Sequence, residues 1–135
     1  MPLDLALSTN TPTAALELRQ AQPLGDQRHV AAFLVVRSGV FAAALPFVFT
    51  SRALASFTEA LDTVARSRTG EAELSGRDGG NIVRFEVNAG GALHITGTLA
   101  DPDDDTQRLQ FAFGVPWEGV VAFAGVVREL IDLNA

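Results

Sequence analysis

The sequence predicts a two-layer α+β fold, in which a mainly antiparallel β-sheet carries two amphipathic helices on one face. Hydrophobic and polar residues alternate along most of the chain, two segments switch to helical spacing, and glycine-rich turns separate the alternating segments. With 135 residues, 47% hydrophobic and 19% charged, the chain has the size and composition of one domain, spanning residues 1–135.

The strands are predicted from alternation with a period of two, which places every second side chain on the same sheet face. The hydrophobic residues that share one face are Leu3, Leu5, Leu7, Leu16, Leu18, Phe41, Leu45, Phe47, Phe49, Ala72, Leu74, Val83, Phe85, Val87, Leu93, Ile95, Leu99, Leu109, Phe111 and Phe113. Pro46 lacks a backbone donor and therefore predicts an edge position or a bulge. Segment 20–29 has no periodicity and predicts a connecting loop.

Residues 30–49 form a long hydrophobic stretch that has the length of a membrane helix. Such a helix would have to contain Arg37, Ser38, Gly39 and Pro46. A hairpin that turns at Ser38–Gly39 accommodates all four residues. We therefore predict a hairpin here. The glycine-containing segments 75–81 and 88–91 predict two further turns.

Two helices are predicted from hydrophobic residues at steps of three and four. The first contains Leu54, Phe57, Leu61 and Val64, and Ser51 is its predicted cap. The second contains Val120, Phe123, Val127 and Leu130. Pro116 suits the first turn of that second helix.

The chain contains a repeated pattern. Segment 45–50 reads LPFVFT and segment 109–114 reads LQFAFG, 64 positions later, while the two helical patterns are offset by 66. We interpret this as an internal duplication of a β-β-α unit, although convergence driven by packing would give the same pattern.

The second helix has an unusual outer face. No polar side chain occurs from Gly119 to Val127, and the middle of the outer face consists of Ala122 and Gly125. Two interpretations stay open: deep burial of the helix, or a homodimer contact through Ala122 and Gly125.

The sequence shows no convincing catalytic, cofactor-binding or metal-binding set. There are no cysteines, and His29 and His94 are the only histidines, neither of them at metal-ligand spacing. A net charge of −6 and scattered arginines disfavour nucleic-acid binding. We expect no enzyme activity, no cofactor and no membrane segment, and the composition and the lack of a targeting signal favour a cytoplasmic location.

The acidic stretch 101–105 is the candidate partner-binding segment, with Asp101, Asp103, Asp104 and Asp105. Its first three alternate aspartates match a calcium loop, but Thr106 replaces the glycine and Ala112 replaces the closing glutamate of that motif. What remains is a charged loop that is either solvated or in contact with a basic partner.

Two further residues bear on function. Arg37 follows Phe33 and Val35 on one strand face, so a deep polar pocket around it would favour an enzyme, whereas an arginine at a strand end normally reaches solvent. Trp117 is interpreted as an anchor of the second helix on the sheet, with a binding hot spot as the alternative.

The order of a GALHITGTL strand (91–99), an LQFAFG strand and a VVAFAGVVREL helix resembles the WapI-like immunity proteins of bacteria. The resemblance covers residues 30–133 and implies a small cytosolic α+β protein that neutralises a cognate toxin by protein–protein contact. It implies no catalytic residues, because each member's binding surface follows its own toxin.

From the sequence we therefore expect a non-catalytic binding protein with a protein partner, for which an immunity-type inhibitor of a bacterial toxin is the specific hypothesis. The alternatives are an acidic dimeric export chaperone or adaptor, and a small α+β enzyme with a pocket between sheet and helices.

Overall fold

The computed structural model consists of two four-stranded antiparallel sheets, each followed by one helix, and describes residues 3–7, 14–26, 28–76, 81–100, 103 and 108–133. The strand orders are β1-β2-β3-β4 and β5-β6-β7-β8. The elements are β1 (Leu3–Leu7), β2 (Ala14–Pro23), β3 (His29–Ser38), β4 (Phe41–Thr50), α1 (Ser51–Ser67), β5 (Glu71–Ser75), β6 (Ile82–Val87), β7 (Leu93–Ala100), β8 (Arg108–Val115) and α2 (Trp117–Leu133).

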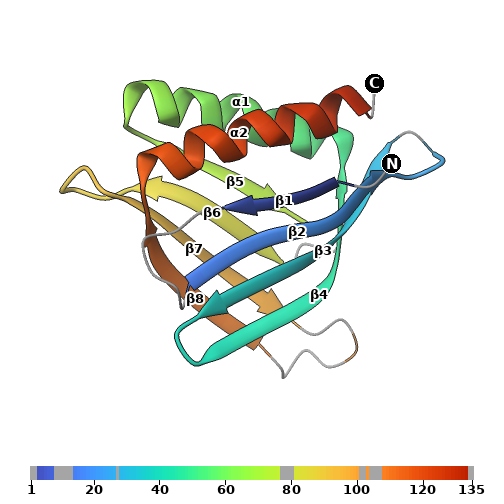
Figure 1. Cartoon of the computed structure of the whole chain (residues 1–135), viewed down its shortest axis with the longest axis horizontal. Helices are drawn as coiled ribbons and strands as arrows, with labels where there is room; N and C mark the ends of the chain where they lie inside the picture. The colour runs from blue at the N-terminus through green and yellow to red at the C-terminus, as the bar shows by residue number, and fades with distance from the viewer. Residues whose placement is uncertain are drawn as a thin grey trace.

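The two helices lie side by side at one end of the molecule and cover the sheets below them (Figure 1). Helix α1 packs mainly along β5, and α2 packs mainly along β1. Each half of the chain therefore covers the sheet of the other half with its helix. The predicted two-layer α+β fold with antiparallel sheets and two amphipathic helices is confirmed.

The repeated unit is longer than the predicted β-β-α motif. The segments β3-β4-α1 and β7-β8-α2 correspond to that motif, and two further strands precede each of them. The repeat is thus four strands and a helix. Within it, the matching residues Phe47 and Phe111 are both buried in the core.

The N-cap of the first helix lies one residue earlier than predicted. Thr50, not Ser51, is the N-cap: it has extended backbone angles, and its hydroxyl oxygen accepts a hydrogen bond of 3.0 Å from the Ala53 amide. An N-cap must be non-helical, and the last residue of β4 already meets that condition. Pro116 directly precedes α2, and its carbonyl accepts from the Gly119 and Val120 amides, so it occupies the cap position, one residue before the predicted first turn.

The predicted loop 20–29 is wrong for its first part, because β2 continues to Pro23. Gln20 has a φ of 55°, and the register of β2 against β3 shifts between Arg19 and Gln22. This bulge moves the next buried position from residue 20 to Ala21, so the alternation that marks a strand is interrupted in the sequence. The Gln20 amide is held by the Asp4 carboxylate at 2.8 Å.

Residues 30–49 belong to the β3–β4 hairpin, as predicted, with Gly39 at a φ of 65° in the turn. Pro46 lies on β4, which is an edge strand, so the expected edge position is confirmed. Among the described residues, no helix is both long and hydrophobic enough to cross a membrane.

Phe85 of β6 lies at the centre of the core, where both helices meet the second sheet. Its ring centroid is 5.6 Å from that of Phe57 on α1 and 5.9 Å from that of Phe123 on α2. The buried polar side chains among the described residues, Thr58 and Asn81, have hydrogen-bond partners: Thr58 donates to the Leu54 carbonyl, and Asn81 accepts from the Ala100 amide. The space between the layers is otherwise filled by hydrophobic side chains.

Gly97 leaves room for a core phenylalanine. A Cβ atom on Gly97 would lie 2.5 Å from the Phe111 ring and 2.6 Å from the Ile82 carbonyl oxygen. We predict that Gly97→Ala lowers the free energy of unfolding by about 1–3 kcal/mol, because overpacking forces the ring and the neighbouring strand to move. Urea denaturation measures this change. Gly114→Ala on β8 is the matched control, since its Cβ would meet its nearest neighbour at 3.9 Å; an equal loss in both variants would contradict the steric explanation.

Candidate protein-binding surface

The outer face of the second sheet is mostly polar. Glu73 pairs with Arg84 across β5 and β6, and Arg84 pairs with Thr96 on β7. The Arg84 guanidinium donates to the Glu73 carboxylate at 2.6 Å. This hydrogen bond and the nearby charge of Glu71 raise the pKa of Arg84 above its ordinary value. The face is therefore typical of a solvated sheet surface.

The outer face of the first sheet differs, because its two last strands are hydrophobic on both sides. Phe33 on β3 pairs with Pro46 on β4, and Val35 pairs with Ala44. Phe33 is 48% exposed. The outward positions of β3 and β4 thus continue a hydrophobic strip along the hairpin where the corresponding positions of the second sheet are polar.

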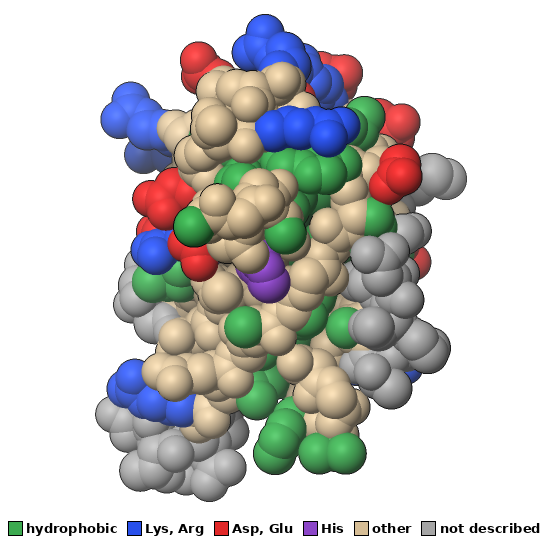
Figure 2. All heavy atoms as spheres, turned by 90° about the vertical axis from the view of Figure 1, so that its left-hand side faces the viewer, with side chains coloured by type: hydrophobic (Ala, Val, Ile, Leu, Met, Phe, Trp, Pro, Cys, Tyr) green, Lys and Arg blue, Asp and Glu red, His purple; other side chains and the backbone are tan. Residues whose placement is uncertain are grey.

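The tip of the same hairpin is also hydrophobic and exposed. Val40 is 93% and Phe41 63% exposed. Of the four large hydrophobic residues that are exposed among the described residues, three lie on this hairpin, and the fourth is Val121 on α2. Hydrophobic side chains gather at the lower end of the face seen in Figure 2, the end at which β3 and β4 turn in Figure 1. We call Phe33, Val40, Phe41 and Pro46 the hairpin surface.

A groove of about 570 Å³ runs beside this hairpin. One wall is the stretch of β4 from Phe41 to Pro46, and the other consists of the end of β7 and the beginning of β8. The residues of that second wall are Leu99, Ala100, Asp103, Arg108 and Leu109. The groove therefore has a hydrophobic strand edge on one side and two charged residues, Asp103 and Arg108, at its rim.

Two residues to which the sequence assigned a candidate functional role, Asp103 and Arg37, border the hairpin surface. Asp103 is exposed and lines the groove, whereas Asp101, Asp104 and Asp105 lie outside the described residues. Arg37 is exposed on the outer face, between its strand partners Ala15 and Ala42. It lies at a strand end and reaches solvent, and no deep pocket surrounds it in the described part of the chain.

The second helix exposes the residues that the sequence singled out. Ala122 and Gly125 are both exposed, which makes deep burial of this face wrong, and Val121 beside them is 58% exposed. A Cβ atom on Gly125 would meet nothing within 4 Å, so no contact within the described residues requires glycine there. Trp117 is half-buried, and the Arg68 guanidinium lies 5.0 Å from its ring centroid, which ties the start of α2 to the end of α1.

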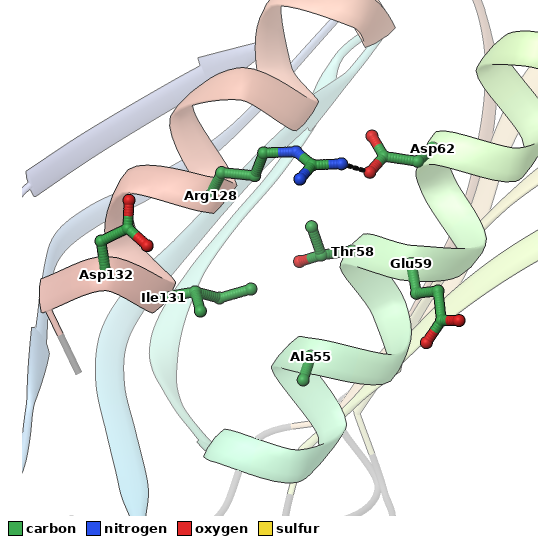
Figure 3. A pocket seen from close by; sticks show the side chains of 7 residues that line it. All are labelled: Ala55, Thr58, Glu59, Asp62, Arg128, Ile131 and Asp132. Carbon is green, nitrogen blue, oxygen red and sulfur yellow. Dashed lines mark ion pairs between the residues drawn. The ribbon is translucent and has the colours of Figure 1, made fainter. Parts of the chain in front are cut away.

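A second hollow, of about 350 Å³, lies between the two helices (Figure 3). Arg128 of α2 points across it to an ion pair with Asp62 of α1, and the Thr58 hydroxyl is already bonded to the Leu54 carbonyl. Glu59 and Asp132 point away from this pair. The Arg128–Asp62 ion pair therefore bridges the two helices across the hollow. No group of residues suited to a metal occurs within the described ranges.

Both histidines have local hydrogen bonds at the ends of strands. His94 Nε2 lies 2.8 Å from the side-chain nitrogen of Asn88. The side-chain oxygen Oδ1 of Asn88 accepts hydrogen bonds from the Gly90 and Ala92 amides of the β6–β7 turn. His29 Nδ1 lies 2.7 Å from an Asp26 carboxylate oxygen. Each histidine thus supports a neighbouring turn.

We predict a pH effect at Asp26. The Arg28 amide and the His29 ring donate to its carboxylate and lower its pKa below the ordinary value. A lowered folded-state pKa stabilises the protein above the unfolded-state pKa, and this contribution disappears as the pH falls through the folded-state pKa. Asp26→Asn should therefore destabilise the protein at neutral pH, and the difference from wild type should vanish in acid. Thermal unfolding across pH checks this; a difference that is independent of pH would contradict it.

The sequence interpretation missed the hairpin surface, although it contained a signal for it. In residues 30–49, hydrophobic residues occupy both the odd and the even positions, including Phe33 and Val35 outward on β3 and Ala44 and Pro46 outward on β4. This run favours a hairpin over a membrane helix. A hairpin that is hydrophobic on both faces also needs a cover on its second face.

The comparisons with known proteins show similarity of fold. No protein-family model and no curated protein matches the chain. Among solved structures, MRP1/MRP2 of Trypanosoma bruciei match with a TM-score of 0.54 and 13% identity, covering 99% of this chain and 86% of that chain. The plant transcriptional regulator PBF-2 matches with a TM-score of 0.51 and 10% identity, covering 99% and 89%. At such identities the likeness concerns the fold alone. The resemblance to WapI-like immunity proteins stays a prediction.

Proposed function

We propose that this chain is a non-catalytic binding protein that acts by protein–protein contact through the hairpin surface. The observation that carries the proposal is the concentration of exposed Phe33, Val40 and Phe41 on one hairpin. A single exposed hydrophobic residue needs no explanation, but several large ones on one hairpin favour an interaction site.

The contrast between the two sheets supports the proposal. Both are four-stranded, antiparallel and followed by a helix, so the fold makes equal demands on their outer faces. On the corresponding strands β7 and β8, the second sheet nevertheless presents the pair Thr98 and Gln110 where the first presents Phe33 and Pro46. The fold therefore does not require the hydrophobic strip, which supports a binding role.

A more specific proposal is the immunity-type inhibitor of a bacterial toxin. It is supported by the net charge of −6, which would attract a basic partner. A toxin that co-purifies with the chain and is inhibited by it in a stoichiometric assay tests this role.

An adaptor or export chaperone is the second candidate. It is favoured by the groove beside β4, because such proteins hold unfolded segments of their cargo and a groove along a strand edge accepts an extended chain. The structural neighbour described as a plant transcriptional regulator suggests a regulatory role as well, but the acidic charge of this chain favours a protein partner.

The hairpin proposal predicts that Phe33→Ser combined with Phe41→Ser abolishes partner capture. Both side chains are exposed, so the free energy of unfolding should change by only about 0.5 kcal/mol per substitution. Tagged wild-type and variant chains are incubated with lysate of the native host, and bound proteins are quantified by mass spectrometry. A specific partner should be retained by wild type and reduced at least tenfold in the variant.

Val121→Ser is the matched control, because it removes an exposed hydrophobic residue of similar kind away from the hairpin. It should capture the partner as the wild type does. If the control loses the partner and the hairpin variant keeps it, binding occurs at α2 and the hairpin proposal is wrong.

We also propose that α2 forms a homodimer contact through Ala122 and Gly125, supported by their exposure beside Val121. Gly125→Arg should then convert a dimer into a monomer in light scattering. Gly125→Ala should retain the dimer and raise the free energy of unfolding by about 0.5–1 kcal/mol, because alanine replaces glycine inside a helix without a clash. A wild-type chain that stays monomeric at high concentration would rule the contact out.

A further inference from the structure

The edge of β4 is a strand edge that nothing in the described chain covers. In the two sheets, β1 is covered by α2 and β5 by α1, whereas β4 and β8 end the sheets on the side away from the helices. An edge strand presents alternate backbone N–H and C=O groups that have no partner in its own sheet. β4 is ten residues long, so this edge is extensive.

Proteins normally protect such edges with charged residues, prolines or bulges. Pro46 protects the half of β4 that leads to α1, because it has no N–H to offer. The other half, Phe41–Leu45, contains one phenylalanine, three alanines and one leucine, and its pairing with β3 shows no register shift. This half of the edge therefore lacks all three protections.

The unprotected half is also the half that lines the groove. The residues of β4 alternate across the sheet, so Phe41 and Leu45 lie on the inner side, and Ala42 and Ala44 lie on the outer side. A chain laid along β4 in extended conformation would place alternate side chains against Leu99 and Leu109 of the opposite wall. The groove supplies side-chain contacts on the same segment on which the edge supplies backbone hydrogen bonds.

We infer that Phe41–Leu45 binds an extended segment of a partner protein as an added antiparallel or parallel strand, with hydrophobic residues at every second position of that segment. The inference rests on the proposed protein-binding function and names the kind of ligand that this site takes. Backbone hydrogen bonds give such a complex its affinity, and the alternate pockets give it its specificity.

The size of the site favours a short partner segment over a second copy of this chain. Five residues of strand extend over about 17 Å, and with a sheet thickness of about 10 Å the edge offers on the order of 200 Å². A stable dimer buries about 800 Å² on each partner. A peptide segment needs no more than the groove provides.

A peptide selection tests the inference. A phage-displayed library of random ten-residue peptides is selected on the full chain, and the strongest sequence is synthesised with a fluorescent label. We expect hydrophobic residues at alternate positions and binding that falls at least tenfold with Phe41→Ser. Val121→Ser, the control on α2, should leave the affinity unchanged. Light scattering of the unliganded chain shows in parallel whether Phe41→Ser breaks a self-association; if it does, the occupant is a second copy and the inference is wrong.

Methylation of the peptide's backbone nitrogens, one position at a time, separates strand addition from simple hydrophobic contact. In an added strand only every second N–H faces β4. Methylation at those positions should lower the affinity tenfold or more, and methylation at the intervening positions should have little effect. Loss at every position or at none overturns the inference. If the host partner depends on Phe33 and Phe41 while the methylation pattern is absent, the protein-binding function stands and strand addition is wrong.

Discussion

The contact on which the rest of the structure depends is the row of three aromatic rings formed by Phe57, Phe85 and Phe123. Phe57 comes from the helix of the first half, Phe123 from the helix of the second half, and Phe85 from the second sheet. Aromatic side chains bury large hydrophobic areas and favour specific ring geometries. At this point both helices and the second sheet are fixed relative to one another.

Because both helices lie at one end of the molecule, no helix covers the sheet edges at the other end. The helices cover β1 and β5, so the cores of both sheets close at that end, and β4 and β8 are left as edges at the opposite end. The second sheet meets this situation with polar outward residues such as Arg84 and Thr96. The first sheet instead has Phe33 and Val35 outward and Phe41 at the tip of the hairpin. The proposed binding surface thus lies at the end of the molecule that the helices do not cover.

Much of the fold could be predicted because each element is amphipathic and periodic. Leu54, Phe57, Leu61 and Val64 are all buried on α1 as their spacing indicates. The bulge at Gln20 hid the second part of β2, because a register shift breaks the alternation on which strand prediction depends. The site was harder to predict: the exposure of Phe33 and Phe41 depends on how two sheets diverge, which involves residues far apart in the sequence, such as Leu45 and Leu109 in the two walls of one groove.

The packing of each helix on the sheet of the other half also bears on the evolutionary origin of the chain. A single unit of four strands and one helix would lack the main cover of its own sheet, because α1 packs mainly along β5 and α2 mainly along β1. A half-length ancestor could cover its sheet only as a homodimer, in which the helix of each subunit packs on the sheet of the other subunit. Fusion of the two gene copies would keep this packing within one polypeptide, and the two halves would no longer need to be identical. After such a fusion the outer faces of the two sheets could diverge, one remaining polar and the other becoming hydrophobic.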